Sequence, residues 1–265
     1  MLFILRQLRR SFFQPGKLKT YVAYAVGEIL LIVVGILIAV QIADWNTARA
    51  EKALEQRYLE RLVLNLERDI ERVGFSRALN QLRLQLNGFL LDVSDDSTIA
   101  QGRGVEFMTA IRESCYITEP PLYSDTFEEL KSTGYLGLID DELKEKLYSY
   151  YREDERSRQF VRVRQDITLG FKQLTVPVLS NKQERFMENN GLEIVFPESM
   201  DQVRSMKYDE QEVLEAVERF KANVEMVAYI PLLRDGFFNV IRTQGQTVDL
   251  AKEILLDLDA ELNKD

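Results

Sequence analysis

Side chains that commonly perform catalysis or bind metals are scarce in this sequence. Its 265 residues include no histidine and a single cysteine, Cys115. Histidine is the commonest general base and metal ligand, so its absence removes the usual basis of Ser-His, Cys-His and many metal sites. The acid pairs Asp95-Asp96 and Asp140-Asp141 lack the spacing of an EF-hand calcium loop and fall where loops or helix caps are expected. We therefore expect a protein that is not an enzyme and that has no cofactor and no metal site.

Glu28 is the one acid whose position demands an explanation. It is the only charged residue between positions 21 and 42. A carboxylate inside an apolar run is costly and by default marks a function or a partner. Its carboxylate could reach the lipid headgroups beside Lys17 or Lys19, form a hydrogen bond between the helices of an oligomer, or take part in conducting or gating ions. Gln41 lies about 140° around a helix from Glu28, which argues against one polar seam and a pore.

The run that carries Glu28 has the length of a membrane span. At ~1.5 Å per residue, residues 21–42 form a helix about 33 Å long, and the hydrocarbon core of a bilayer is ~30 Å thick. Tyr21 and Tyr24 at one end and Trp45 at the other are the expected interfacial anchors, together with the lysines noted above. The run exceeds a signal-peptide core of ~7–15 residues, so we interpret it as an uncleaved signal-anchor.

Small residues recur at every fourth position of the predicted span, with Leu31 in the gap. Such spacing allows two membrane helices to approach closely. We expect a helix-association face made of Ala23, Gly27, Gly35, Ala39 and Ala43.

The residues before the span are basic, which predicts the orientation of the chain. Residues 1–20 contain five basic residues and no acid: Arg6, Arg9, Arg10, Lys17 and Lys19. We expect this segment to be amphipathic and cytoplasmic, with its three arginines contacting lipid headgroups. Only three basic residues occur among the 15 that begin at Trp45. The positive-inside rule then places the C-terminal domain outside the cytoplasm, in the periplasm of a bacterium with an inner membrane.

Three domains follow from this division: 1–20, the span at 21–44, and an extramembrane domain at 45–265. The whole chain carries −9 although its first 20 residues carry +5, so the remainder is strongly acidic. Because nucleic-acid binding needs a basic surface, no nucleic-acid partner is expected. The expected fold is mainly α: one transmembrane helix followed by a soluble helical bundle with a long membrane-proximal helix.

An apolar stripe with alternating four- and three-residue spacing supports that long helix. Its members are Leu59, Val63, Leu66, Ile70 and Val73. This is the heptad pattern of a helix that packs in a bundle or coiled coil. A second series with the same spacing begins at Phe75, after a change of register near Gly74.

Turn residues predict where the helices end. Polar residues at 94–104 should end the long helix, and a short helix should cover 105–112. Asp125 is expected to cap the next helix and Gly134 to terminate it.

The second half of the chain should contain further helices and one short strand. Asp140 should cap a helix that runs to about Thr175, and its Arg-rich stretch should be a solvated face of i,i+4 ion pairs. We expect a strand at 192–196 and helix from about 209 onward, interrupted near Pro231.

Two segments resemble an uncharacterised bacterial family of single-span membrane proteins. The first carries Tyr-Ala-Val-Gly-Glu-Ile from Tyr24, Gly-Ile-Leu-Ile-Ala from Gly35 and Trp-Asn at 45–46; the second is residues 128–151. The resemblance implies a protein of the bacterial cytoplasmic membrane. It supplies no catalytic residue and no ligand.

The expected function is a non-enzymatic, membrane-anchored interaction or assembly module. We expect it to form homo-oligomers through the span and the stripe, with the lipid bilayer and other membrane proteins as further partners. The alternative is an extracytoplasmic bundle that senses or binds a ligand and acts through a partner membrane protein. A channel or a membrane-active effector has less support.

Overall fold

The structure, a computed structural model, describes residues 18–192 and 194–263, with side chains for 21–152, 159–192 and 194–263. Within this part of the chain, 85 % of the structure is helical and there is no strand, so the predicted mainly α fold is confirmed. The chain divides into two compact units, residues 1–57 and residues 58–265. Helix α2, Leu18–Asp95, contributes to both units, which are described separately below.

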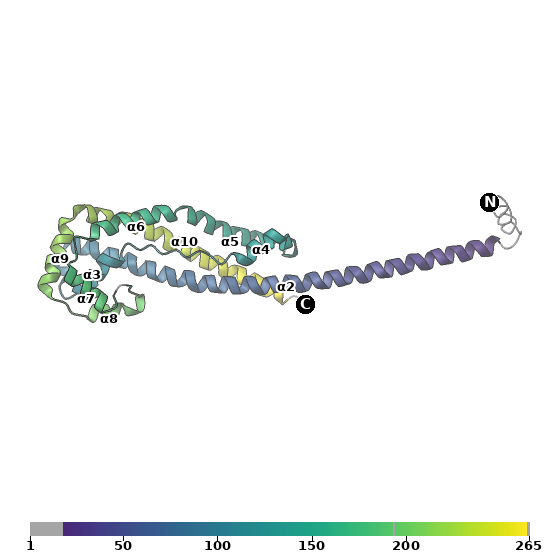
Figure 1. Cartoon of the computed structure of the whole chain (residues 1–265), viewed down its shortest axis with the longest axis horizontal. Helices are drawn as coiled ribbons and strands as arrows, with labels where there is room; N and C mark the ends of the chain where they lie inside the picture. The colour runs from purple at the N-terminus through teal and green to yellow at the C-terminus, as the bar shows by residue number, and fades with distance from the viewer. Residues whose placement is uncertain (1–17, 193, 264–265) are drawn as a thin grey trace. The chain divides into compact units, whose positions relative to one another are not determined.

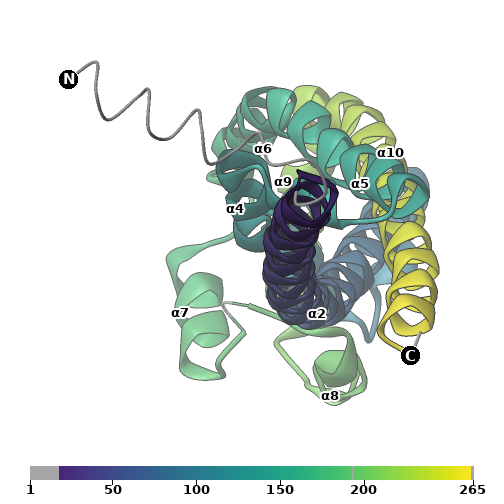
Figure 2. The ribbon, with the colours of Figure 1, turned by 90° about the vertical axis from the view of Figure 1, so that its right-hand side faces the viewer.

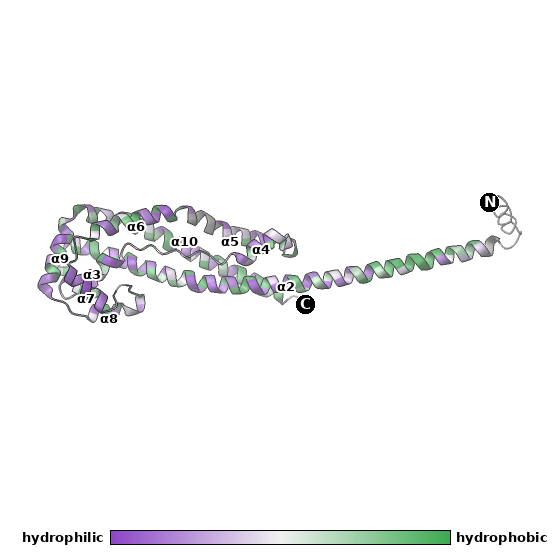
Figure 3. Cartoon of the chain, viewed as in Figure 1, coloured by the Kyte–Doolittle hydropathy of each residue, from purple (hydrophilic) through white to green (hydrophobic). Residues whose placement is uncertain are grey.

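The first unit contains the apolar part of α2 (Figure 3). Every side chain from position 21 to position 50 is exposed. No proline interrupts this stretch. By length and composition this helix could cross a membrane.

The second unit is built around four long helices (Figure 1). They are the rest of α2, α5 (Asp141–Gln159), α6 (Val161–Thr175) and α10 (Val224–Leu262). Helix α10 packs against both α5 and α6. At one crossing of α6 and α10, a Cβ atom added to Gly170 would lie 2.4 Å from the hydroxyl of Tyr229, so a larger residue would force the Tyr229 side chain to move.

The second unit also contains shorter helices. The α-helices are α3 (Gly104–Glu113), α4 (Asp125–Thr133), α7 (Asn181–Asn189), α8 (Met200–Ser205) and α9 (Glu210–Ala222). Three short 3₁₀ helices are η1 (Ser97–Ala100), η2 (Tyr135–Leu138) and η3 (Pro197–Ser199). Figure 2 shows α7 and α8 on the side of the unit opposite α5 and α6.

Large apolar side chains from distant parts of the sequence form the core of the second unit. Fully buried examples are Leu86 of α2, Phe107 of α3, Phe171 of α6, Phe220 of α9 and Phe237 of α10. Each such side chain contributes roughly 1.5–3 kcal/mol relative to leaving it in water. This burial fixes the face that each helix turns inward.

Several predicted boundaries are confirmed. Helix α2 ends at Asp95 and α3 occupies nearly the predicted positions. Gly134 ends α4 with a φ of 79°, a conformation that disfavours any side chain. Asp140 caps α5 by accepting a hydrogen bond of 2.9 Å from the backbone N–H of Glu142.

Other predictions of local structure are wrong. The helix expected from 141 to 175 breaks at Phe160. Pro231 lies inside α10, and the interruption falls instead at Asn223, whose side chain caps α10. Asp125 is the first residue of α4 rather than its cap. Among the described residues of 192–196 there is no strand, because no neighbouring strand is present to pair with their backbone.

Candidate functional site

A row of polar side chains on α2 is the most unusual feature of the second unit. The row consists of Asp69, Arg72, Ser76, Asn80, Arg83 and Asn87, and we call it the polar seam. Spacings of three and four residues place its members on one face of the helix. All of them except Arg72 are at most 6 % exposed. Because buried polar groups need partners, this face must be matched by hydrogen-bonding groups elsewhere in the unit.

The partner is the irregular segment between α3 and α4, residues 114–124, which we call the strap. At its centre, the backbone of Thr118 is bonded on both sides. The side-chain amide of Asn80 donates to the Thr118 carbonyl at 2.6 Å, and its oxygen accepts from the Thr118 N–H at 2.9 Å. Ser76 also donates to this carbonyl, at 2.8 Å. Side chains of the polar seam therefore form hydrogen bonds with backbone groups of the strap that have no partner in a helix or sheet.

Gln244 of α10 joins the same network. Its oxygen accepts from the Asn80 amide at 3.0 Å, and its nitrogen donates to Ser76 at 2.9 Å and to the Thr118 carbonyl at 3.0 Å. The strap is thus held between α2 and α10 by side chains from both.

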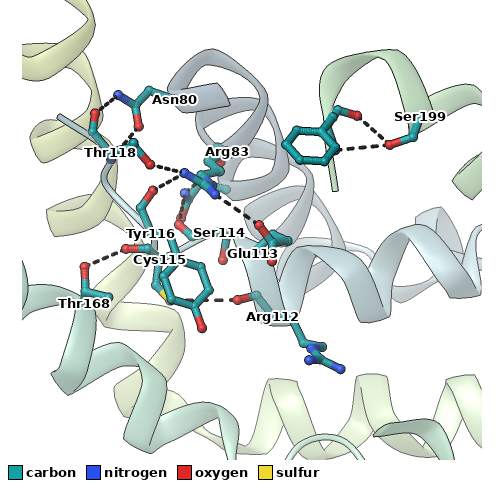
Figure 4. Close-up of polar contacts among 12 residues, drawn as sticks. Asn80, Arg83, Arg112, Glu113, Ser114, Cys115, Tyr116, Thr118, Thr168 and Ser199 are labelled. Atoms are coloured by element: carbon teal, nitrogen blue, oxygen red, sulfur yellow. Dashed lines mark hydrogen bonds and ion pairs between the residues drawn. The ribbon is translucent and has the colours of Figure 1, made fainter. Parts of the chain in front are cut away.

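Arg83 binds the first part of the strap (Figure 4). Its guanidinium donates to the carbonyl of Tyr116 at 2.7 Å and to the hydroxyl of Thr118 at 2.5 Å. It also forms an ion pair of 3.3 Å with Glu113. Burial raises the pKa of the Glu113 carboxyl, and the charge of Arg83 opposes that rise. The pair is a structural charge pair inside the protein rather than an exposed acid or base.

The two ends of the strap are held in the same way. At one end, the side-chain amide of Asn87 donates to the carbonyl of Ser114 at 2.7 Å. At the other end, Asp69 accepts from the N–H of Tyr123 at 3.0 Å, and Arg72 donates to the carbonyl of Pro121. The polar seam therefore follows the strap along its whole length.

Two pockets open beside the strap, on either side of the ion pair between Glu119 and Arg164. The larger has a volume of about 590 Å³ and lies between α6 and α10. Its apolar wall consists of Phe160, Val163, Ile167, Leu232 and Val240. Polar groups at its rim are Asp235, Asn239, Arg242 and Thr243. The smaller, of about 490 Å³, lies between the strap and α6.

Arg164 departs from the prediction made for the Arg-rich stretch. We expected a solvated face of local ion pairs, but its side chain is only 15 % exposed and pairs with the distant Glu119. The side chains of 153–158 lie outside the described residues, so this part of the prediction is not tested.

Cys115 is unsuited to nucleophilic chemistry. It is 1 % exposed. Burial, with the nearby charge of Glu113, raises the pKa of its thiol to about 12. Because the thiolate is the reactive form, this cysteine is inert in the folded protein. Among the described residues, no cluster of three or more acids or cysteines has the geometry to hold a metal ion.

The residues predicted from the apolar run all lie on the exposed surface of α2. A Cβ atom added to Gly27 or Gly35 would meet nothing within 4 Å. Glu28 is exposed, as are the predicted anchors Tyr21, Tyr24 and Trp45. The two glycines and Glu28 are therefore not buried against other described parts of the chain.

The five small residues do not share one face of this helix. At about 100° per residue, each step of four residues turns by about 40°, so Ala23 and Ala43 lie about 200° apart. The predicted face divides into Ala23 with Gly27 and, separately, Gly35 with Ala39 and Ala43. The second group contains three successive small residues and lies on the same side as Glu28.

The predicted basic residues fall largely outside the described structure. Arg6, Arg9, Arg10 and Lys17 precede residue 18, and Lys19 lies in α2 without a described side chain.

The Leu59–Val73 stripe packs inside the second unit. Leu59, Leu66 and Val73 are at most 3 % exposed, and Val63 and Ile70 are half-buried. Three of the five side chains of the stripe are thus covered within the second unit. The expectation that the stripe also drives self-association stays a prediction.

Sequence reasoning missed the polar seam, although a signal was present. Asn80 and Asn87 lie seven residues apart within a long predicted helix. Asparagine is unfavourable in helix interiors, so two asparagines on one face of a helix indicate that their side chains have a specific hydrogen-bond partner. The partner, an irregular strap held by backbone contacts, has no sequence pattern of its own.

No protein-family model, no curated protein and no solved structure matches this chain in the comparisons made. The resemblance to a family of single-span membrane proteins therefore stays a prediction.

Proposed function

We propose that this protein is a non-enzymatic membrane-anchored module that associates with further copies through its span. The observation that supports it is the apolar part of α2, in which an 18-residue window has a mean hydropathy of 2.6 and no buried residue. A helix so apolar on all sides is stable in hydrocarbon and is a liability in water. The proposed setting is a bacterial inner membrane, with the N-terminus in the cytoplasm and the second unit in the periplasm.

Association through the span uses the face of Gly35, Ala39 and Ala43. Lipid and leucine are equally apolar, so membrane helices associate by close backbone packing at small residues. Glu28 lies about 20° from Gly35 around the helix and can form a hydrogen bond between copies on this face. That arrangement gives the carboxyl group a partner in an otherwise apolar environment.

Disulfide crosslinking tests the proposed face. In a Cys115→Ser background, the full-length chain would carry Gly35→Cys, Ala39→Cys or, as the matched control, Leu37→Cys on the opposite side of the helix. After oxidation in native membranes, the first two variants should form disulfide-linked dimers and the control should not. Equal crosslinking of all three variants, or none in any, would contradict the proposed face.

Ligand binding by the second unit is a second candidate function, favoured by the larger pocket beside the strap. Its volume of about 590 Å³ falls within the usual ~300–1,000 Å³ of small-molecule sites. Its apolar wall includes side chains exposed to an unusual degree, Phe160 at 58 % and Val163 at 53 %. In this candidate function, a partner membrane protein would transmit the binding across the membrane.

A fluorescent apolar probe, anilinonaphthalene sulfonate, tests this candidate. Val163→Trp fills the pocket wall and should remove at least half of the probe bound to the detergent-solubilised full-length chain, measured against detergent alone. Leu256→Trp, at a position 71 % exposed and away from the pocket lining, should leave binding unchanged. Equal binding by both variants and the parent would count against the pocket as a ligand site.

A further inference from the structure

The part of α2 that follows the apolar run has a hollowed face with an unusual composition. The hollow has a volume of about 490 Å³ and is lined by Trp45, Ala48, Arg49, Lys52, Ala53 and Gln56. Two alanines leave space between the longer side chains. The guanidinium carbon of Arg49 lies 5.7 Å from the ring centre of Trp45, a cation–π contact. An aromatic ring and two cations thus border one open space.

Acidic side chains in this segment lie on a different side of the helix. At about 100° per residue, Arg49 and Lys52 lie within about 40° of Trp45. Asp44, Glu51 and Glu55 lie about 80–120° from it, all in the same direction. The helix is therefore divided into a basic face with Trp45 and an acidic face beside it. Of these acids, Glu55 lies about 60° from Lys52, and all three lie at least about 120° from Arg49, so Arg49 is the cation best placed to attract an anion.

Trp45 lies at the depth of the headgroup layer of a bilayer, and the backbone of Arg49 and Lys52 lies beyond that layer. Counted from Ile42 at ~1.5 Å per residue, Trp45 lies about 4.5 Å, Arg49 about 10 Å and Lys52 about 15 Å beyond the apolar run. The headgroup layer is roughly 5–8 Å thick on each side. Helical side chains lean towards the N-terminus, here towards the span, so the long basic side chains can reach back to the phosphates.

We propose that Trp45, Arg49 and Lys52 form a binding site for the headgroup of an anionic phospholipid. The guanidinium of Arg49 and the ammonium of Lys52 donate hydrogen bonds to phosphate oxygens, and the indole of Trp45 packs at the level of the glycerol. No acid lines the hollow, so the site offers nothing to a choline or ethanolamine group and favours an anionic lipid. This proposal rests on the membrane span of the proposed function.

Trp45 is the only tryptophan, so its fluorescence reports on this site alone. The full-length chain is reconstituted into phosphatidylcholine vesicles in which about one lipid in ten is phosphatidylglycerol. Bromine atoms, which quench tryptophan on contact, are placed on the acyl chains of one lipid or the other. Brominated phosphatidylglycerol should quench Trp45 well beyond its share of the lipid.

Two variants test which residues select the lipid. Arg49→Gln with Lys52→Gln should lower the preference for phosphatidylglycerol, by up to about fivefold for each residue. Arg57→Gln removes a basic residue about 120° from Trp45 and should leave the preference unchanged. Quenching by each lipid in proportion to its share, unchanged in the double variant, would overturn the headgroup site.

The same quenching measurement distinguishes a failure of the headgroup site from a failure of the proposed membrane span. If neither brominated lipid quenches Trp45, the residue is not at a membrane and the proposed function fails as well. If brominated phosphatidylcholine quenches but no preference exists, the span stands and only the headgroup site fails. Excess inorganic phosphate should not change the preference; its loss would show that these residues bind free phosphate instead of lipid.

Discussion

Glu106 and Glu113, two buried acids on α3, differ in their partners. Glu106 is 2 % exposed, yet two arginines bind it: Arg103 at 2.8 Å and Arg204 at 3.0 Å. Burial alone would raise the pKa of its carboxyl, but the hydrogen bonds and charges of the two arginines lower it. Glu113 forms an ion pair with Arg83. Burial raises the pKa of its carboxyl, and the charges of Arg83 and Arg112 oppose that rise without cancelling it. The balance between burial and cationic partners therefore differs between the two acids.

Glu106→Gln should therefore destabilise the protein in a pH-dependent way. With a lowered folded-state pKa, the charged carboxylate stabilises fully above its ordinary pKa of 4.5, and this contribution is lost as pH falls through the folded-state pKa. We expect the free energy of unfolding to drop by about 2 kcal/mol at pH 7. Urea unfolding in detergent should show the difference shrinking below pH 4.5. If the difference in free energy of unfolding between the variant and the parent protein does not change with falling pH, Glu106 acts through packing alone.

Cys115 should resist alkylation in the folded protein. Its burial and its thiol pKa of about 12 leave almost no accessible thiolate at pH 8. Maleimide labelling followed by mass spectrometry should modify it only after denaturation. Rapid labelling of the native chain would contradict its buried position. Labelling of Cys115 in intact cells consequently cannot report the orientation of the span, which needs an exposed cysteine such as Leu256→Cys in a Cys115→Ser background.

The strap depends on side chains of α2 and α10 rather than on secondary structure. Asn80→Ala would remove the acceptor of the Thr118 N–H and the donor to the side-chain oxygen of Gln244. Unsatisfied buried groups cost about 1–3 kcal/mol each, so we expect a loss of about 3 kcal/mol in the free energy of unfolding. The strap should also become cleavable by protease.

Asn46→Ala makes the same chemical change on an exposed face of the same helix. It should alter the free energy of unfolding by less than about 0.5 kcal/mol. If Asn80→Ala is equally mild, the polar seam does not hold the strap.

The sequence predicted an element correctly where a residue at the element's own boundary determines it, and failed where distant residues do. Gly134 marks the end of a helix through its backbone conformation and Asp140 marks the start of one through its side chain, and both predictions were correct. The break at Phe160 has no glycine or proline to mark it in the sequence. Pro231 is tolerated within α10, where a sequence rule expects an interruption. The Glu119–Arg164 pair joins residues 45 positions apart, which local patterns do not connect.

The two units of the chain differ in how far their apolar side chains are buried. In residues 58–265 most side chains of the apolar stripes of α2 are buried or half-buried. From position 21 to position 50, in contrast, every described side chain is exposed. In the function proposed above, a bilayer covers these side chains, and another copy of the span packs against its small residues.

The mass of the full-length protein in mild detergent, at micromolar concentration, tests this arrangement most directly. We predict a particle that contains more than one chain and that becomes monomeric when Gly35→Leu and Ala39→Leu block the close approach of two helices. Leu30→Ala with Leu37→Ala, on the opposite side of the helix, should leave the mass unchanged. A strictly monomeric parent protein would contradict self-association through the span.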